Sequence, residues 1–77
     1  MTRRKSLTPA FGRALQEARL LAALTQERLA FKSHVHPTYI SQIERGLKSP
    51  SLDVVAAIAL ALHIKASELI RMAEELR

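Results

Sequence analysis

Apolar residues recur along the chain at spacings of three and four, the pattern of helices that bury one face. The clearest stripe predicts a helix over residues 9–23, with Thr8 as its cap residue and Pro9 in its first turn. The apolar positions of this stripe are Phe11, Leu15, Ala18, Leu21 and Ala22. Gly12 lies inside the helix, where glycine costs about 1 kcal/mol relative to alanine. We therefore expect another backbone to approach it closely.

Four further helices follow, each marked by capping residues or by its apolar stripe. They are predicted over residues 25–32, 37–45, 51–61 and 66–75. Thr25 and Ser51 are the caps of the first and third of these, while Pro37 and Gly46 mark the ends of the second. No alternating strand pattern and no internal repeat is present, so we predict an all-α fold, a five-helix bundle.

The bundle is expected over residues 8–77, preceded by a basic arm over residues 1–7. Arg3, Arg4 and Lys5 are adjacent in this arm. Either the arm is a solvated tail, or it touches the phosphates of a nucleic acid.

Only three or four residues connect the helix over 25–32 to the helix over 37–45. So short a connection forces a sharp turn, the arrangement of a helix-turn-helix, in which the second helix lies in the major groove of DNA. Ile40 and Ile43 would anchor this second helix in the core. Its other side then carries residues 37, 38, 41, 42 and 45.

Composition narrows the possible partners. Twelve Lys and Arg against seven Asp and Glu give a net charge of +5, which favours a polyanionic partner such as nucleic acid. The three aromatic residues are too few for a surface that stacks single-stranded bases. The chain has no cysteine, which excludes disulfides, zinc–thiolate sites and thiol nucleophiles. We expect a cytoplasmic protein.

The sequence contains no motif typical of an enzyme. The chain has no phosphate-binding glycine loop, no nucleophile elbow and no constellation of paired carboxylates. His34 and His36 are the one pair that hints at a metal, and without a nearby cysteine we interpret them as structural or phosphate-facing. We therefore expect no enzyme activity, no metal, no cofactor and no small-molecule substrate.

The stretch TQERLAFKSHVHPTYISQIERGLKSPSLDVVAAIALAL resembles the helix-turn-helix family of phage Cro and repressor proteins, often called the XRE family. The similarity extends over roughly residues 9–70. Its matching features are Gln26, Leu29-Ala30, the Ile-x-x-Ile-Glu-Arg-Gly sequence of residues 40–46, and Pro50-Ser51-Leu52. The chain length and the Thr38-Tyr39-Ile40-Ser41 stretch are also similar to the small controller proteins of restriction–modification systems.

This resemblance implies a lambda-repressor-like fold and a transcriptional regulator that binds a double-stranded DNA operator. It also implies residue roles. Gln26 would hydrogen-bond a phosphate at a helix N-terminus, where backbone N–H groups also favour an anion. Arg19 and Glu44 would form a partly buried ion pair that orients the reading helix. Pro37 occupies a position at which several relatives place a polar or Arg reader, so that base contact is lost or becomes apolar.

The remaining candidates follow from side-chain chemistry. Thr38, Ser41 and Gln42 are the base-edge candidates, since glutamine can bond adenine bidentately and the threonine methyl can meet a thymine methyl. Arg45 and Lys48 are expected to reach the DNA backbone, and His36 can touch a phosphate. Tyr39 either bonds a phosphate or packs its ring against the preceding helix. Each position has the alternative of being ordinary solvated surface.

A second apolar surface is predicted on the helix over 51–61, beside the stripe that faces the core. We interpret it as the interface of a homodimer, whose two-fold symmetry would match a pseudo-palindromic operator and place the reading helices about 34 Å apart. The predicted interface residues are Val54, Ala57, Leu60, Ala61, Leu69, Ile70 and Met72. The alternative is that this surface is covered by the C-terminal helix of the same chain.

A competing function is a protein-interaction module, such as an antitoxin, in which the second surface grips another protein. The two functions predict different salt dependence, because DNA affinity falls steeply with salt. A membrane-binding role is disfavoured, since the last helix carries Glu68, Glu74 and Glu75 beside its basic residues.

Overall fold

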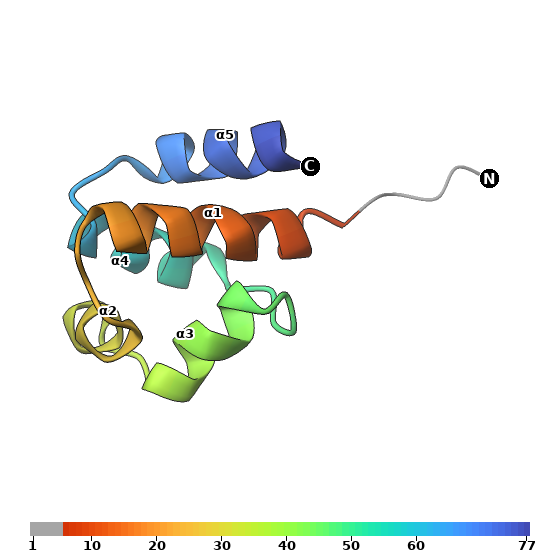
Figure 1. The fold of residues 1–77 in the computed structure, drawn as a ribbon. Helices are drawn as coiled ribbons and strands as arrows, with labels where there is room; N and C mark the ends of the chain where they lie inside the picture. The colour runs from red at the N-terminus through yellow and green to blue at the C-terminus, as the bar shows by residue number, and fades with distance from the viewer. Residues whose placement is uncertain (1–5) are drawn as a thin grey trace.

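The computed structural model describes residues 6–77, which form five α-helices and the connections between them (Figure 1). They are α1 (Thr8–Leu21), α2 (Gln26–Ser33), α3 (Pro37–Glu44), α4 (Leu52–Ala61) and α5 (Ala66–Leu76). No strand occurs in these residues, which confirms the all-α prediction, and the helix ends lie within two residues of the predicted ones. Most of the predicted basic arm, including Arg3, Arg4 and Lys5, lies outside the described residues.

Local capping explains where the helices begin. The Thr25 hydroxyl accepts the Arg28 N–H at 3.0 Å, and the Ser51 hydroxyl accepts the Val54 N–H at 3.1 Å, so both predicted caps are confirmed. The predicted cap at Thr8 is wrong. Thr8 is already helical, and its N–H donates to the Ser6 hydroxyl at 3.1 Å.

The helices α1 and α5 lie side by side and run in opposite directions, with α2 and α3 beneath α1 (Figure 1). In addition, α1 contacts α3, while α4 contacts both α2 and α5. Each helix contributes at least one large side chain to a single apolar core. The fully buried large side chains are Leu15, Leu29, Ile40, Ile43, Ile58 and Leu69. Within residues 6–77, no helix has the length and apolar content needed to cross a membrane.

The crossing of α1 and α3 depends on Gly12. A Cβ atom on Gly12 would collide with the Ile43 carbonyl oxygen and lie 2.7 Å from the Glu44 carbonyl oxygen. The expected close approach of another backbone is therefore confirmed, and the approaching backbone is the last turn of α3. Any larger residue at this position would push α3 away from α1.

Candidate nucleic-acid interface

The connection between α2 and α3 is three residues long and turns sharply. At its start, His34 adopts a left-handed conformation with φ of 60°, and the Val35 N–H donates to the Ala30 carbonyl at 3.0 Å. At its end, His36 is extended and Pro37 begins α3. Val35 packs against the core between them. These features give the helix-turn-helix arrangement that the short connection predicts.

The helix α3 has one buried and one accessible side. Ile40 and Ile43 are completely buried, so they fix the helix on the core. Because successive residues rotate by about 100° around a helix, five other positions fall together on the opposite side. Of these, Thr38 and Arg45 are exposed and the others are half-buried. The accessible positions are Pro37, Thr38, Ser41, Gln42 and Arg45. The four base-edge candidates therefore share one side of α3, as predicted; whether they contact DNA remains a prediction.

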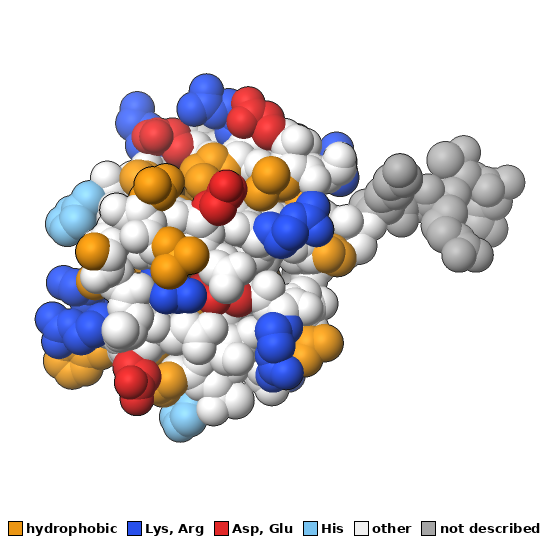
Figure 2. Space-filling view, viewed as in Figure 1, with side chains coloured by type: hydrophobic (Ala, Val, Ile, Leu, Met, Phe, Trp, Pro, Cys, Tyr) orange, Lys and Arg blue, Asp and Glu red, His pale blue; other side chains and the backbone are white. Residues whose placement is uncertain are grey.

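The candidates for DNA-backbone contacts lie around this side. Gln26 is the first residue of α2, and Arg45 and Lys48 are exposed at and beyond the end of α3. Tyr39 is half-buried and packs against the core cluster, and its contact with a phosphate stays a prediction. Figure 2 shows basic side chains over α2 and beside the C-terminal end of α3, so positive charge flanks the accessible side.

Arg19 and Glu44 form the predicted ion pair between α1 and the end of α3. The Arg19 Nε and Nη2 atoms donate to the two Glu44 carboxylate oxygens at 2.7 and 3.1 Å, and both residues are buried. The third guanidinium nitrogen donates to the Leu24 carbonyl at 2.8 Å. This bidentate geometry fixes both side chains, because a planar guanidinium matches a carboxylate in one relative orientation.

Gln26 joins this pair, which the sequence did not reveal. Its Nε2 donates to Glu44 Oε1 at 2.9 Å, across 18 positions of sequence. An amide nitrogen carries two hydrogens, so one remains for the phosphate contact that the family resemblance implies. The N-terminus of α2 is thereby linked to the end of α3 through a single carboxylate.

His36 caps α3 with its ring. Its Nδ1 atom accepts the Thr38 N–H at 3.1 Å, the role that hydroxyl groups fill at α2 and α4. His34 instead ends α2, so the two histidines have separate structural positions. Within residues 6–77, no cluster of three His, Cys, Asp or Glu side chains has a metal-binding arrangement.

The predicted dimer surface stays a prediction, and one of its residues is wrong. Leu60 is 77% exposed, and Val54, Ala57, Ala61, Ile70 and Met72 are half-buried. Leu69 is completely buried in the core of its own chain, so it cannot contact a partner. Leu52, which the sequence did not single out, is 84% exposed on the same helix as Leu60.

Comparison with known proteins agrees with this geometry. The family model described as helix-turn-helix matches residues 15–69. The chain is 41% identical to control protein C.BamHI from Bacillus amyloliquefaciens over 61 residues, which span 78% of this chain and 75% of that protein.

Two solved structures have the same fold. The clp gene regulator ClgR from Corynebacterium glutamicum is 32% identical and superposes with a TM-score of 0.89 over 95% of this chain and 78% of that chain. The restriction–modification controller protein C.Esp1396I, solved as a tetramer with its 35-base-pair operator, is 27% identical with a TM-score of 0.83 over 95% of this chain and 96% of that one. With a family match over most of its length, the chain belongs to the helix-turn-helix family of the Cro/repressor (XRE) type.

Proposed function

We propose that this protein is a transcriptional regulator that binds double-stranded operator DNA as a homodimer, with α3 in the major groove. One observation carries the proposal: α3 is anchored from one side by Ile40 and Ile43 and leaves its base-edge candidates accessible on the other. A helix held in this way can enter the groove without giving up core contacts, since its buried side chains stay in place.

The Arg19–Glu44–Gln26 network supports the same function. It ties the last turn of α3 to α1 and to the N-terminus of α2. Base-edge hydrogen bonds require a reading helix with a fixed position, because bidentate contacts lose their geometry with small displacements. We propose that orienting α3 is the role of this network, while a phosphate at the N-terminus of α2 uses the second hydrogen of Gln26.

The homodimer part of the proposal rests on the outer side of α4. Leu52 and Leu60 are largely exposed on this helix, which also carries the half-buried Val54, Ala57 and Ala61, and a contiguous apolar surface of this kind suits a partner. Leu52 also lines an apolar groove together with Phe11, Val55 and Ile70, so the surface continues from α4 to α5. A second copy would bury this surface isologously and place two α3 helices about 34 Å apart.

The relatives favour gene regulation over the antitoxin alternative. One is named a control protein, one a gene regulator, and one a restriction–modification controller solved on its operator. For this chain we propose the narrower role of a controller protein, since two of the three relatives are of that kind. The identity of the neighbouring genes tests the narrower role directly.

The deciding experiment for DNA binding is selection of bound sites from a pool of random duplexes with the full chain. We expect enrichment of a pseudo-palindromic site. Four phosphate contacts from Arg45 and Lys48 of two protomers would give a log–log salt slope of about −3.6, at roughly −0.9 per contact. Absence of any enriched site, together with affinity indifferent to salt, would contradict the proposal.

A further inference from the structure

The cap residue of α3 has a second nitrogen on the far side of its ring, whereas the caps of α2 and α4 use a single hydroxyl oxygen. Resting on the proposed function, we infer that the neutral imidazole of His36 donates its Nε2 hydrogen to a DNA phosphate oxygen while its Nδ1 atom caps the reading helix. One side chain would thus both begin α3 and fix the position of α3 on the DNA backbone.

The direction of the capping bond determines where the proton lies. The Thr38 backbone N–H can only donate, so the His36 Nδ1 atom, 3.1 Å away, must accept with its lone pair. A neutral imidazole carries one ring hydrogen, which then must be on Nε2. The imidazolium form would place a hydrogen on Nδ1, facing the Thr38 N–H, and would break the cap.

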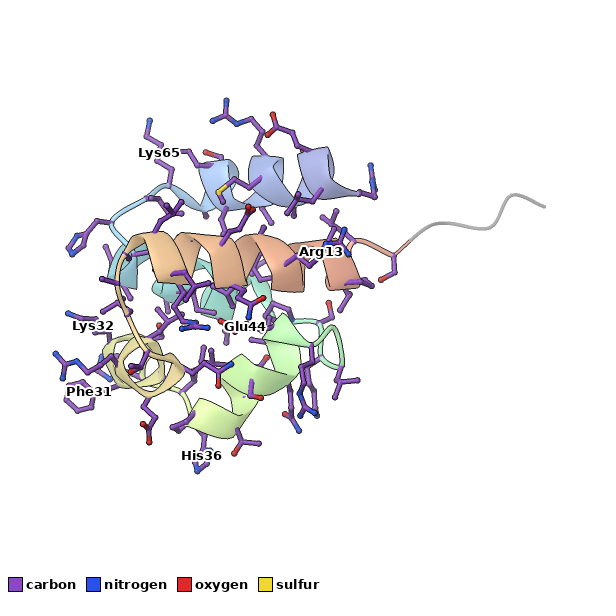
Figure 3. All side chains as sticks on the ribbon, viewed as in Figure 1. Arg13, Phe31, Lys32, His36, Glu44 and Lys65 are labelled. Atoms are coloured by element: carbon purple, nitrogen blue, oxygen red, sulfur yellow. The ribbon has the colours of Figure 1, made fainter. Side chains whose placement is uncertain are left out.

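In the other caps the acceptor and the remaining O–H donor belong to the same oxygen atom. Thr25 and Ser51 cap α2 and α4 through single hydroxyl oxygens, each held close to the helix end that it caps. An imidazole has its second nitrogen on the far side of the ring, so capping and outward donation are compatible. His36 is exposed, and Figure 3 shows its ring at the beginning of α3, directed away from the body of the molecule.

The position of His36 points to the backbone of DNA. His36 is extended and precedes the first helical residue, so its ring stands at the N-terminal end of α3, outside the helical side that carries Thr38 and Gln42. His36 ends the turn between α2 and α3, so its exposed ring lies at the end of the reading helix, where the DNA backbone borders the groove. A neutral Nε2–H donates and cannot accept, and phosphate oxygens only accept, so the two groups match.

A neutral donor leaves a measurable signature. Its hydrogen bond to a phosphate adds affinity, but it neutralises no charge and so releases no counterion. We expect His36→Ser, whose hydroxyl keeps the cap, to bind the selected operator about tenfold more weakly per half-site. The log–log salt slope should stay unchanged. The matched control is Arg45→Ala, which should make the slope shallower by about 0.9 per half-site.

The capping role is tested separately from the DNA contact. His36→Ala removes both, so it should lower the melting temperature below that of His36→Ser while losing the same DNA affinity. In the free protein, nitrogen NMR of the ring should show a proton on Nε2 and none on Nδ1. The His63 ring, which makes no hydrogen bond within the described residues, should show a mixture of the two tautomers.

Each other outcome overturns the inference. If His36→Ala binds as tightly as the unaltered protein, the ring makes no contact with DNA. If its salt slope becomes shallower by about 0.9 per half-site, the ring binds as a cation and not as a neutral donor. Either result leaves the proposed function standing as long as the unaltered protein binds its selected site. Failure of the unaltered protein to bind any duplex would instead overturn the proposed function.

Discussion

Gln42 and Arg45 lie three residues apart on the accessible side of α3, and we expect their different chemistry to give them different roles in DNA binding. An amide can satisfy the donor and acceptor of one base edge, which distinguishes sequences. A guanidinium at the helix end pairs with phosphates, which are the same in every sequence. Sequence discrimination and overall affinity are therefore expected to reside in separate residues.

Gln42→Ala tests the first of these assignments. We expect it to lose about 1–3 kcal/mol of discrimination at one base pair of each half-site, because one base edge is left without its partner. Competition binding between the selected operator and its single-base variants measures this loss. Arg45→Ala is the matched control and should weaken the operator and the variants alike. Equal weakening by Gln42→Ala would contradict its assignment to a base.

The Arg19–Glu44 pair is a residue-scale feature with consequences for stability. A buried pair need not add net stability, since both charges lose hydration, but removal of one partner leaves the other buried and unpaired. Glu44 is held by Arg19 and Gln26 together, so its loss affects two helices besides its own.

We expect Glu44→Leu to lower the free energy of unfolding by about 3–5 kcal/mol, because the Arg19 guanidinium stays buried without its carboxylate. The double change Arg19→Met/Glu44→Leu should recover most of this loss. Urea unfolding of both variants measures the difference. A double variant as unstable as Glu44→Leu would show that the loss comes from packing and not from the unpaired charge. The recovered variant should still bind DNA poorly if the pair orients α3.

At the scale of the elements, three helices are followed by non-glycine residues with left-handed backbones, which the sequence pattern does not predict. Three residues other than glycine have left-handed backbones within residues 6–77: Ala23 after α1, His34 after α2 and His63 after α4. A residue with a Cβ atom is strained in this conformation by about 1–2 kcal/mol, and glycine is not. The turns are thus imposed by the packing of the helices that they connect.

Ala23→Gly should therefore raise the free energy of unfolding by roughly 1 kcal/mol, by removing the strain at φ of 57°. Ala22→Gly is a matched control one residue earlier, where φ is −84° and alanine is unstrained. That change should lower the free energy by about 0.5–1 kcal/mol, because glycine gains more freedom on unfolding. Thermal or urea unfolding measures both. Changes of the same sign in the two variants would contradict the explanation.

At the scale of the whole molecule, the distribution of side chains separates two surfaces. The base-edge candidates lie on α3, while the exposed leucines Leu52 and Leu60 lie on α4. A regulator of this size contributes few contacts by itself, so a second copy is the simplest way to double its contact with DNA. Oligomeric state and DNA binding should accordingly change together.

Leu60→Glu should convert the proposed homodimer to a monomer, since a buried carboxylate without a partner is strongly unfavourable. Sedimentation velocity measures the change, and the affinity for the selected operator should fall with it. Leu20→Glu is the matched control, because Leu20 is a leucine 61% exposed on α1, outside the proposed interface. A Leu60→Glu variant that sediments like the unaltered protein would refute the α4 interface.

The sequence by itself determined the five helices, the caps at Thr25 and Ser51, and the accessible side of α3. These features depend on residues within one or two turns of each other, so periodicity and capping chemistry reveal them. The sequence also predicted the close backbone approach at Gly12, because a glycine inside a helix lowers its stability unless another element needs the space. The family resemblance, and not the spacing, supplied the pairing of Arg19 with Glu44.

Only the tertiary structure decided the rest. It placed Leu69 in the core, although its helical spacing suits a partner surface equally well. It also brought Gln26 to Glu44 across 18 positions of sequence. The physical reason is the same in each case: which face of a helix is buried, and which distant side chains meet, depends on how the helices cross. No local pattern encodes that crossing.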